Sequence, residues 1–200
     1  MEGIGIMGGT FDPIHTGHLL TAEFVRDAYG LEKVLFIPAA HSPFKLDKRV
    51  ASAEDRLAMT ELAVAGNPHF EASDIEMCRE GVSYTSDTIA LLAERFGPEV
   101  PLYFITGADA INDLPDWHQP RELLASCHFI AARRQGTALD MAKLRGFFGS
   151  LCDAHSHELA TPELEISSTQ IRGRIREGRS IRYMVPESVE TYIRKEGLYR

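Results

Sequence analysis

The chain has 200 residues, of which 44% are hydrophobic and 25% charged, and this balance excludes a disordered, collagen-like or disulfide-scaffold protein. The formal net charge of −8 argues against nucleic acid or an anionic membrane as a partner, because both attract a basic surface. Apolar runs stay far below the ~20 residues that span a bilayer. The start of the chain lacks a signal-peptide pattern, and the scattered Cys78, Cys127 and Cys152 suggest reduced thiols, so we expect a cytoplasmic protein.

Short apolar runs alternate with helical periods along the chain. They predict strands at 3–7, 33–37, 102–106 and 128–132, an extended segment at 70–78, and helices at 17–29, 52–66, 85–96, 168–177 and 187–196. Ser52 is the expected N-cap of one helix, and glycines such as Gly30 and Gly197 mark helix ends. Residues 138–157 show no readable pattern, and we expect His155-Ser156-His157 to lie on the surface rather than to form a metal site.

This alternation predicts an α/β fold with a doubly wound, mostly parallel sheet. We expect a single domain over residues 1–200, with a small helical portion at about 165–200. Doubly wound sheets bind ligands beyond the carboxyl ends of their strands. The segments that follow residues 7, 37, 106 and 132 are therefore the places to look for a site.

The first motif follows the first predicted strand and reads Gly8-Gly9-Thr10-Phe11-Asp12-Pro13-Ile14-His15-Thr16-Gly17-His18. Two glycines allow backbone N–H groups to approach an anion closely. The next helix begins near Thr16, so its N-terminal N–H groups face the same place. His15 and His18 are one turn apart and can point together at a phosphate chain.

The second motif lies near the other end and reads Ile166-Ser167-Ser168-Thr169-Gln170-Ile171-Arg172. Hydroxyl groups at a helix start can cap the helix or bind phosphate. Arg172, one turn into the helix, can form a fork with phosphate oxygens. Taken alone, the motif is equally typical of an ordinary N-cap followed by an exposed arginine.

Together the two motifs resemble the HxGH nucleotidylyltransferase superfamily, and the likeness covers the whole chain. Further segments resemble its bacterial nicotinate-mononucleotide adenylyltransferase branch: Ser83-Tyr84-Thr85, Gly107-Ala108-Asp109 followed by Trp117, Arg133-Arg134, and Tyr192-Ile193 with Gly197-Leu198-Tyr199-Arg200. The resemblance implies a Rossmann-like nucleotidyltransferase fold. It also implies an enzyme of NAD biosynthesis that converts ATP and nicotinate mononucleotide to nicotinate adenine dinucleotide and pyrophosphate.

The implied chemistry needs no general base, because the second pKa of a phosphate monoester is near 6 and the attacking group is already ionised. Catalysis would consist of alignment and charge neutralisation around the α-phosphorus. The resemblance implies Mg²⁺ as cofactor, held by phosphate oxygens and water rather than by protein side chains.

The resemblance also assigns residues. The implied catalytic residues are His15, His18, Lys45 and Arg172, with His18 nearest the α-phosphate. The implied ATP ligands are Gly8, Gly9, Thr10, Phe11, Gly107, Asp109, Ser168 and Arg172. The implied nicotinate mononucleotide ligands are Thr85, Trp117, His118, Lys45 and Arg134.

Three of these residues have simple structural alternatives. Asp109 could accept hydrogen bonds from ribose hydroxyls or cap the next helix, and Trp117 could stack on the pyridine ring or fill the core. Lys45 could neutralise phosphate or lie in a solvated loop. At the helix start, Thr85 would favour the pyridine carboxylate over a neutral amide.

Four other functions remain in view. They are nicotinamide mononucleotide or phosphopantetheine adenylyl transfer, cytidylyl transfer, and a non-catalytic adenine-nucleotide sensor. A stand-alone nucleic-acid binder lacks the extended basic face it would need. The oligomeric state is open between monomer and homo-oligomer.

The acidic total charge hides a local basic region. Residues 54–99 contain ten acidic and three basic residues, whereas residues 170–182 contain five arginines and one acid. A small electropositive site inside an acidic protein therefore suits a substrate as anionic as ATP.

Overall fold

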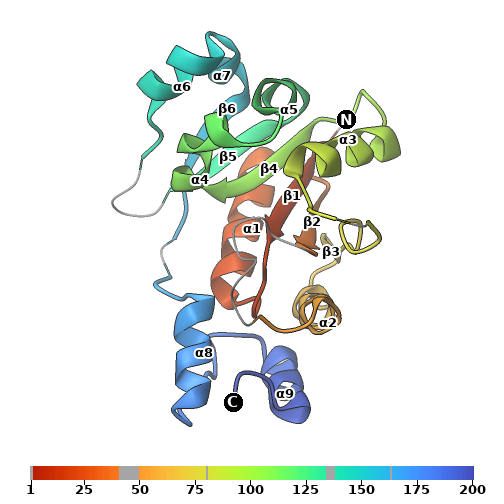
Figure 1. Cartoon of the computed structure of the whole chain (residues 1–200), viewed down its shortest axis with the longest axis vertical. Coiled ribbons are helices and arrows are strands. Elements are labelled where there is room, and N and C mark those ends of the chain that lie inside the picture. The colour runs from red at the N-terminus through yellow and green to blue at the C-terminus, as the bar shows by residue number, and fades with distance from the viewer. Residues whose placement is uncertain (1, 41–49, 80, 134–137, 163) are drawn as a thin grey trace.

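The computed structural model describes residues 2–40, 50–79, 81–133, 138–162 and 164–200 (Figure 1). The elements in chain order are β1 (Ile4–Gly9), α1 (Thr16–Tyr29), β2 (Lys33–Pro38), α2 (Ala53–Val64), β3 (Phe70–Ala72), α3 (Thr85–Phe96), β4 (Leu102–Gly107), α4 (Ala108–Asn112), the short 3-10 helix η1 (Leu114–Asp116), α5 (Pro120–Ser126), β5 (His128–Arg133), α6 (Met141–Phe148), α7 (Leu151–His155), β6 (Ser156–Ala160), α8 (Ser168–Arg176) and α9 (Glu187–Glu196).

The strands form one sheet in the order β3-β2-β1-β4-β5-β6. Every pairing among these strands is parallel, so the predicted doubly wound α/β fold is confirmed, and the described sheet is fully rather than mostly parallel. The strand order reverses direction between β1 and β4, which pair directly. Such a switch point places a crevice at the carboxyl ends of these two strands.

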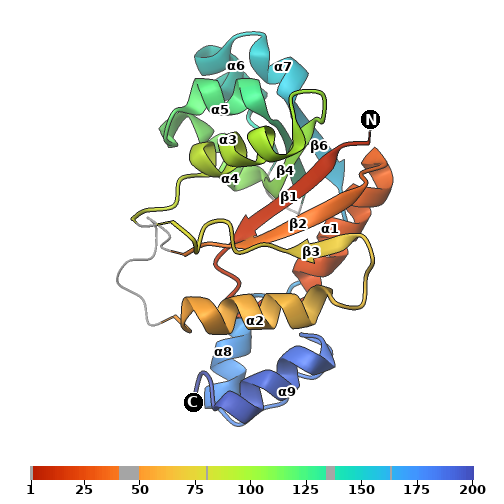
Figure 2. The same cartoon turned by 90° about the vertical axis from the view of Figure 1, so that its right-hand side faces the viewer.

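Both faces of the sheet are buried, which explains why the strands read as continuous apolar runs. Along β2, Leu35 and Ile37 point into one hydrophobic cluster, while Val34 and Phe36 point into the other. Helices α3, α5, α6 and α7 cover the first face, and α1, α2, α8 and α9 contribute to the cluster on the second (Figure 2).

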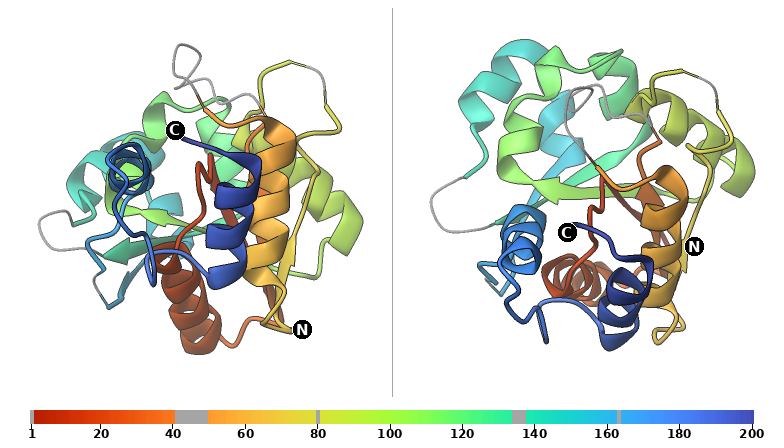
Figure 3. Two further views of the ribbon diagram at one scale, coloured as in Figure 1. Left: turned by 90° about the horizontal axis from the view of Figure 1, so that it is seen from below. Right: turned by 60° about the horizontal axis from the view of Figure 1, so that its bottom comes forward.

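The two C-terminal helices belong to the packing of the sheet. Ile171 of α8 and Ile193 of α9 are buried in the same cluster as Val25 of α1 and Met59 of α2. Seen from below, α9 runs beside α2 (Figure 3). The backbone N–H of Thr16 donates to the carbonyl of Met184 over 2.9 Å, so the C-terminal segment holds the start of α1.

Local signals explain most helix limits. Ser52 caps α2 as predicted, since its hydroxyl oxygen accepts the backbone N–H of Asp55 over 3.0 Å. Helix α1 ends where Gly30 adopts a left-handed conformation and donates to the carbonyls of Arg26 and Asp27. Helix α3 spans the residues predicted for it, and Gly97 follows as its C-cap.

The prediction of an extended segment over 70–78 is wrong for most of its length. Only Phe70–Ala72 pair with β2, and the residues that follow form turns. Residues 138–157, which had no readable pattern, include α6, α7 and the start of β6.

The expectation of a surface position for His155-Ser156-His157 also needs correction. These residues are half-buried beside β5, because β6 adds to that edge of the sheet. Nε2 of His157 lies 3.1 Å from Nδ1 of His128, and the rings of His155 and His128 stack with centroids 4.7 Å apart. In the described part of the chain, no helix is long and apolar enough to cross a membrane.

Candidate active site

The turn after β1 forms the floor of the candidate site. Gly8 and Gly9 end the strand, and Phe11 adopts a φ of 48°, so the chain turns sharply before Asp12. A Cβ on Gly9 would lie 3.1 Å from the Phe11 ring, which is a tight contact. Glycine at this position avoids that contact and carries no side chain that would keep a ligand away from the backbone.

The predicted histidine pair lies at the start of α1. The rings of His15 and His18 stack with centroids 3.7 Å apart, and the backbone N–H of His15 donates to Nδ1 of His18 over 3.2 Å. A Cβ on Gly17 would lie 3.1 Å from the His15 ring. Gly17, the third glycine of the motif, thus makes room for the first histidine. His15 is buried, whereas His18 is partly exposed.

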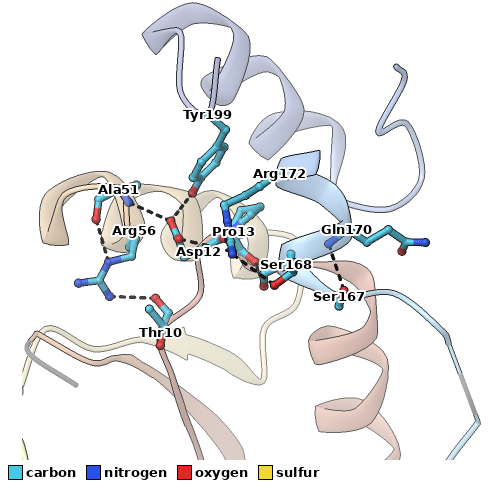
Figure 4. Close-up of polar contacts among 11 residues, drawn as sticks. Thr10, Asp12, Pro13, Ala51, Arg56, Ser167, Ser168, Gln170, Arg172 and Tyr199 are labelled. Carbon is cyan, nitrogen blue, oxygen red and sulfur yellow. Dashed lines mark hydrogen bonds and ion pairs between the residues drawn. The ribbon is translucent and has the colours of Figure 1, made fainter. Parts of the chain in front are cut away.

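Helix α8 brings the second motif against this turn (Figure 4). Ser167 caps the helix by accepting the backbone N–H of Gln170 over 3.1 Å. The Ser168 hydroxyl donates to the carbonyl of Pro13 over 2.9 Å. Arg172 donates from Nη1 to the carbonyl of Asp12 over 2.7 Å. The two motifs, 155 to 160 residues apart, therefore meet.

A cavity of about 520 Å³ opens from the glycine turn toward α3 and η1. This volume lies within the range of small-molecule sites. It brings together a set of the residues expected from sequence: Gly8, Gly9, Thr10, Thr85, Trp117 and His118. Phe104 and Thr106 of β4 also line it, so the cavity lies at the β1–β4 switch point.

Trp117 packs against the core and also lines the cavity, so the core alternative and the stacking alternative are both compatible with its position. It lines the cavity, and its ring meets those of Phe104 and Phe129 edge to face, with centroids 6.1 and 6.3 Å apart. The indole is partly buried against the core, which fixes its orientation and leaves an aromatic surface toward the cavity.

An aromatic pair closes one side of the cavity. The rings of Tyr84 and His118 stack with centroids 4.3 Å apart, and Nδ1 of His118 lies 3.1 Å from the Ser86 hydroxyl. Thr85 lies between these residues at the first position of α3. The positive end of this helix dipole therefore faces a cavity wall and suits an anionic group.

Glu76 is a buried acid in the same wall that the sequence did not reveal. The Thr88 hydroxyl donates to its Oε1 over 2.8 Å. Burial raises the pKa of Glu76, since desolvation disfavours the carboxylate more than its hydroxyl partners favour it. A lone glutamate after a short edge strand carries no motif that would have identified it.

Asp109 lies beyond β4, over the glycine that ends the strand. A Cβ on Gly107 would lie 2.4 Å from Oδ1 of Asp109, so a side chain there would displace the exposed Asp109 carboxylate. The N-cap of α4 is Gly107 itself, and Asp109 is an exposed residue of the first turn. The helix-capping alternative for Asp109 is therefore wrong, and its carboxylate faces solvent.

Two predicted residues need a refined role, and two cannot be placed. The Phe11 side chain is buried against Phe36 and His18, so we expect any nucleotide contact there from its backbone. The Ser168 hydroxyl already donates its proton to the carbonyl of Pro13. We therefore expect a phosphate to accept hydrogen bonds from the backbone N–H groups at the start of α8 instead. Lys45 and Arg134 lie outside the described residues.

Buried Arg56 is a further residue that sequence reasoning missed. Its guanidinium donates to the carbonyls of Thr10, Ala39 and Ala51 over 2.9, 2.7 and 3.2 Å. Burial lowers its pKa, against the attraction of Asp12. Arg56 thus holds the far side of the glycine turn through these hydrogen bonds.

Among the residues that the structure describes, no group of three or more His, Cys, Asp or Glu side chains is arranged to hold a metal ion.

Comparison with known proteins gives a consistent picture. A model of the cytidylyltransferase-like family matches residues 6–174. A protein of Moorella thermoacetica named "Probable nicotinate-nucleotide adenylyltransferase" is 50% identical over 98% of this chain and 91% of its own length. A protein of the same name from a Thermoanaerobacter species is 47% identical over 98% of this chain and 94% of its own.

Solved structures share the fold at lower sequence identity. Nicotinic acid mononucleotide adenylyltransferase of Plasmodium falciparum, complexed with NaAD, superposes with a TM-score of 0.80 at 21% identity, covering 100% of this chain and 98% of its own. The same enzyme complexed with APC gives a TM-score of 0.77 at 20% identity, with the same coverage.

Proposed function

The chain belongs to the cytidylyltransferase-like family, and from this premise we propose that it transfers the adenylyl group of ATP to nicotinate mononucleotide, giving nicotinate adenine dinucleotide and pyrophosphate. It is a nucleotidyltransferase of NAD biosynthesis. The observation that carries the proposal is the continuity of the glycine turn with both a histidine pair and a cavity lined by Thr85 and Trp117. One wall suits phosphate, and the other suits an aromatic ring that carries an anionic group.

The reaction joins two phosphates. An ionised phosphate oxygen of nicotinate mononucleotide attacks the α-phosphorus of ATP, and the bond from that phosphorus to the bridging oxygen of the β-phosphate breaks. Pyrophosphate leaves with the electron pair. The attacking phosphate is already largely ionised at neutral pH, so a protein base is not required.

The protein stabilises charge and alignment in this scheme. His18, partly exposed at the start of α1, stabilises the negative charge that develops at the α-phosphate. The buried His15 ring stacks on His18 and holds it in place. Arg172 and the first turn of α8 receive the departing pyrophosphate, and Lys45 adds a further positive charge.

The mononucleotide occupies the cavity in the same scheme. The pyridine ring stacks on Trp117, and its carboxylate accepts hydrogen bonds at the start of α3, near Thr85. Outside this cavity, Asp109 belongs to the ATP ligands and accepts hydrogen bonds from the ribose hydroxyls of ATP. A neutral amide gains less from the positive end of α3, so the acid is the preferred substrate over nicotinamide mononucleotide.

Mg²⁺ accompanies ATP and is bound by phosphate oxygens and water. The groups near the glycine turn include the side chains of His18 and Arg172 and backbone N–H groups, and the Asp12 carboxylate is paired with Arg172, so this set fits phosphate rather than a metal. When bound, the ion neutralises part of the phosphate charge. We place the enzyme in the cytoplasm as one domain, a compartment that the three free cysteines support.

A product assay tests this function. The protein is incubated with ATP, Mg²⁺ and either nicotinate or nicotinamide mononucleotide, and dinucleotide and pyrophosphate are measured. We expect both products in equal amounts with the acid and slower formation with the amide. Absence of product with both mononucleotides would overturn the proposal, and a preference for the amide would overturn the role given to the start of α3.

A further inference from the structure

Tyr199, which follows α9, returns to the turn after β1 at the opposite end of the sequence. Its hydroxyl donates to Oδ1 of Asp12 over 2.8 Å across 187 residues, as Figure 4 shows. The same carboxylate oxygen accepts the backbone N–H of Ala51 over 3.0 Å. Asp12 is 2% exposed, so this carboxylate depends on the protein for its interactions.

Tyr199 is held in place at a conformational cost. Its φ is 65°, in the left-handed region that non-glycine residues rarely adopt. Its ring packs against the cluster that contains Ile171 and Ile193. Burial and the nearby Asp12 carboxylate raise the pKa of Tyr199, so the phenol keeps its proton and remains a donor.

The second oxygen of Asp12 faces Arg172. Nη1 of Arg172 lies 3.5 Å from Oδ2 and donates to the Asp12 carbonyl over 2.7 Å. In the described structure no hydrogen bond reaches Oδ2, which is fully buried, so the charges of Arg172 and Arg56 offset its burial. Nη2 of Arg172 also lies 3.3 Å from the Thr169 hydroxyl. These contacts fix the plane of the guanidinium against the phosphate-binding turn.

We infer that Asp12 is a positioning residue for ATP, which orients Arg172 toward the triphosphate, and that Tyr199 is the latch that fixes the Asp12 carboxylate. The inference rests on the proposed function, since it assigns a role within the same phosphate site. Oδ1 of Asp12 accepts hydrogen bonds from the Tyr199 hydroxyl and the Ala51 N–H. These bonds orient the carboxylate so that its other oxygen, Oδ2, faces Arg172. The C-terminal segment thereby becomes part of the ATP site.

Removing the latch tests this inference, and the chain offers a matched control. Tyr199→Phe removes the hydroxyl that Asp12 Oδ1 accepts, whereas Tyr192→Phe removes a similar bond from Tyr192 to Asp55 Oδ1 over 2.9 Å. Tyr192 lies in α9 and bonds to Asp55, whereas Arg172 bonds to the Asp12 carbonyl and to Thr169. We expect Tyr199→Phe to raise the KM for ATP about five-fold and to leave the KM for nicotinate mononucleotide unchanged. We expect Tyr192→Phe to lower the melting temperature as much as Tyr199→Phe does, because each variant loses one hydrogen bond. The KM for ATP and the KM for nicotinate mononucleotide should both stay unchanged in Tyr192→Phe.

A double-mutant cycle tests whether Asp12 acts through Arg172. Asp12→Asn turns an amide or a neutral oxygen toward the guanidinium, so we expect the KM for ATP to rise about tenfold. In an Arg172→Ala background the same substitution should add nothing, because the group that Asp12 orients is gone. The dissociation constant of ATP with Mg²⁺, measured by calorimetry, should follow the same pattern without any turnover.

The outcomes separate this inference from the function. If wild type forms no dinucleotide, the proposed function fails, while ATP binding in the variants still reports on Asp12. If wild type is active and Tyr199→Phe binds ATP as Tyr192→Phe does, Tyr199 is not a latch. An equal effect of Asp12→Asn with and without Arg172 would show that Asp12 does not act through it. If Asp12→Asn does not fold, the two tyrosine variants carry the test.

Discussion

The imidazole rings of His15 and His18 stack with centroids 3.7 Å apart at the N-terminus of α1. His15 is buried and His18 is partly exposed, so in the proposed function His18 is the ring that meets the substrate phosphate.

His18→Ala should abolish most of the turnover without loss of the fold. The side chain is partly exposed, so its removal leaves the core intact. Loss of a group that stabilises transition-state charge costs about 100-fold or more in kcat. Steady-state kinetics and a thermal melt measure the two effects, and activity within a few-fold of wild type would remove His18 from this role.

Gly17→Ala should move the His15 ring without destabilising α1, so it tests whether the position of that ring matters for turnover. The new Cβ would lie 3.1 Å from the His15 ring, so the ring must move by a few tenths of an ångström. Alanine is more favourable than glycine within a helix by about 1 kcal/mol, so the melting temperature should hold or rise. We expect kcat to fall by about tenfold, because the stacked pair is displaced. Unchanged kcat would show that the alignment of His15 does not matter.

Trp117→Ala should act mainly on the mononucleotide. Its ring lines the cavity and packs edge to face on Phe104, so the change removes a stacking surface and some core contact. We expect the KM for nicotinate mononucleotide to rise about tenfold, with a smaller change for ATP. Trp117→Phe, as the control, should recover much of the affinity. An unchanged KM in the alanine variant would leave Trp117 with a core role only.

The cluster of His128, His155 and His157 predicts a dependence of stability on pH. Burial lowers the pKa of His128 and of His157, and the neighbouring His155 lowers both further. The folded protein then binds fewer protons than the unfolded chain below about pH 6.5, so this contribution to stability is present above that pH and lost as pH falls through it. His128 also stacks on Tyr103, with ring centroids 4.9 Å apart.

Melting temperatures measured between about pH 7.5 and pH 5.5 test this dependence. Wild type should lose stability over that interval, and His128→Phe, which keeps a ring beside Tyr103, should lose less. Parallel curves for the two proteins would show that the cluster does not account for the loss.

The sequence predicted the parts of the fold that depend on local signals. Helix α3 was predicted to the residue because an apolar period ends at Gly97, and the start of α2 was predicted because Ser52 caps it, whereas α2 ends two residues before the predicted Gly66. Strand β6 was missed, since its Ser-His-Glu-Leu-Ala sequence lacks the apolar run of a buried strand and gains its place by pairing with β5 at the sheet edge. Helix α5, which begins at Pro120, was not among the predicted helices.

The candidate site also has features that the sequence predicted and features that it did not. The glycine turn, the histidine pair and the start of α8 were readable as motifs. The roles of Arg56 and Tyr199 were not, because each depends on contacts with residues far away in the sequence, 46 and 187 positions apart. Asp12 lay inside the motif, but a buried carboxylate between two guanidinium groups is visible only once the chain is folded.

The fate of the α-phosphate of ATP tests the central claim most directly. The protein is incubated with Mg²⁺, nicotinate mononucleotide and ATP that carries a label on the α-phosphate, and the labelled products are separated. We predict that the label enters nicotinate adenine dinucleotide in equal amount to the pyrophosphate released. Label that remains in ATP, or that appears only in AMP or ADP, would contradict adenylyl transfer to the mononucleotide.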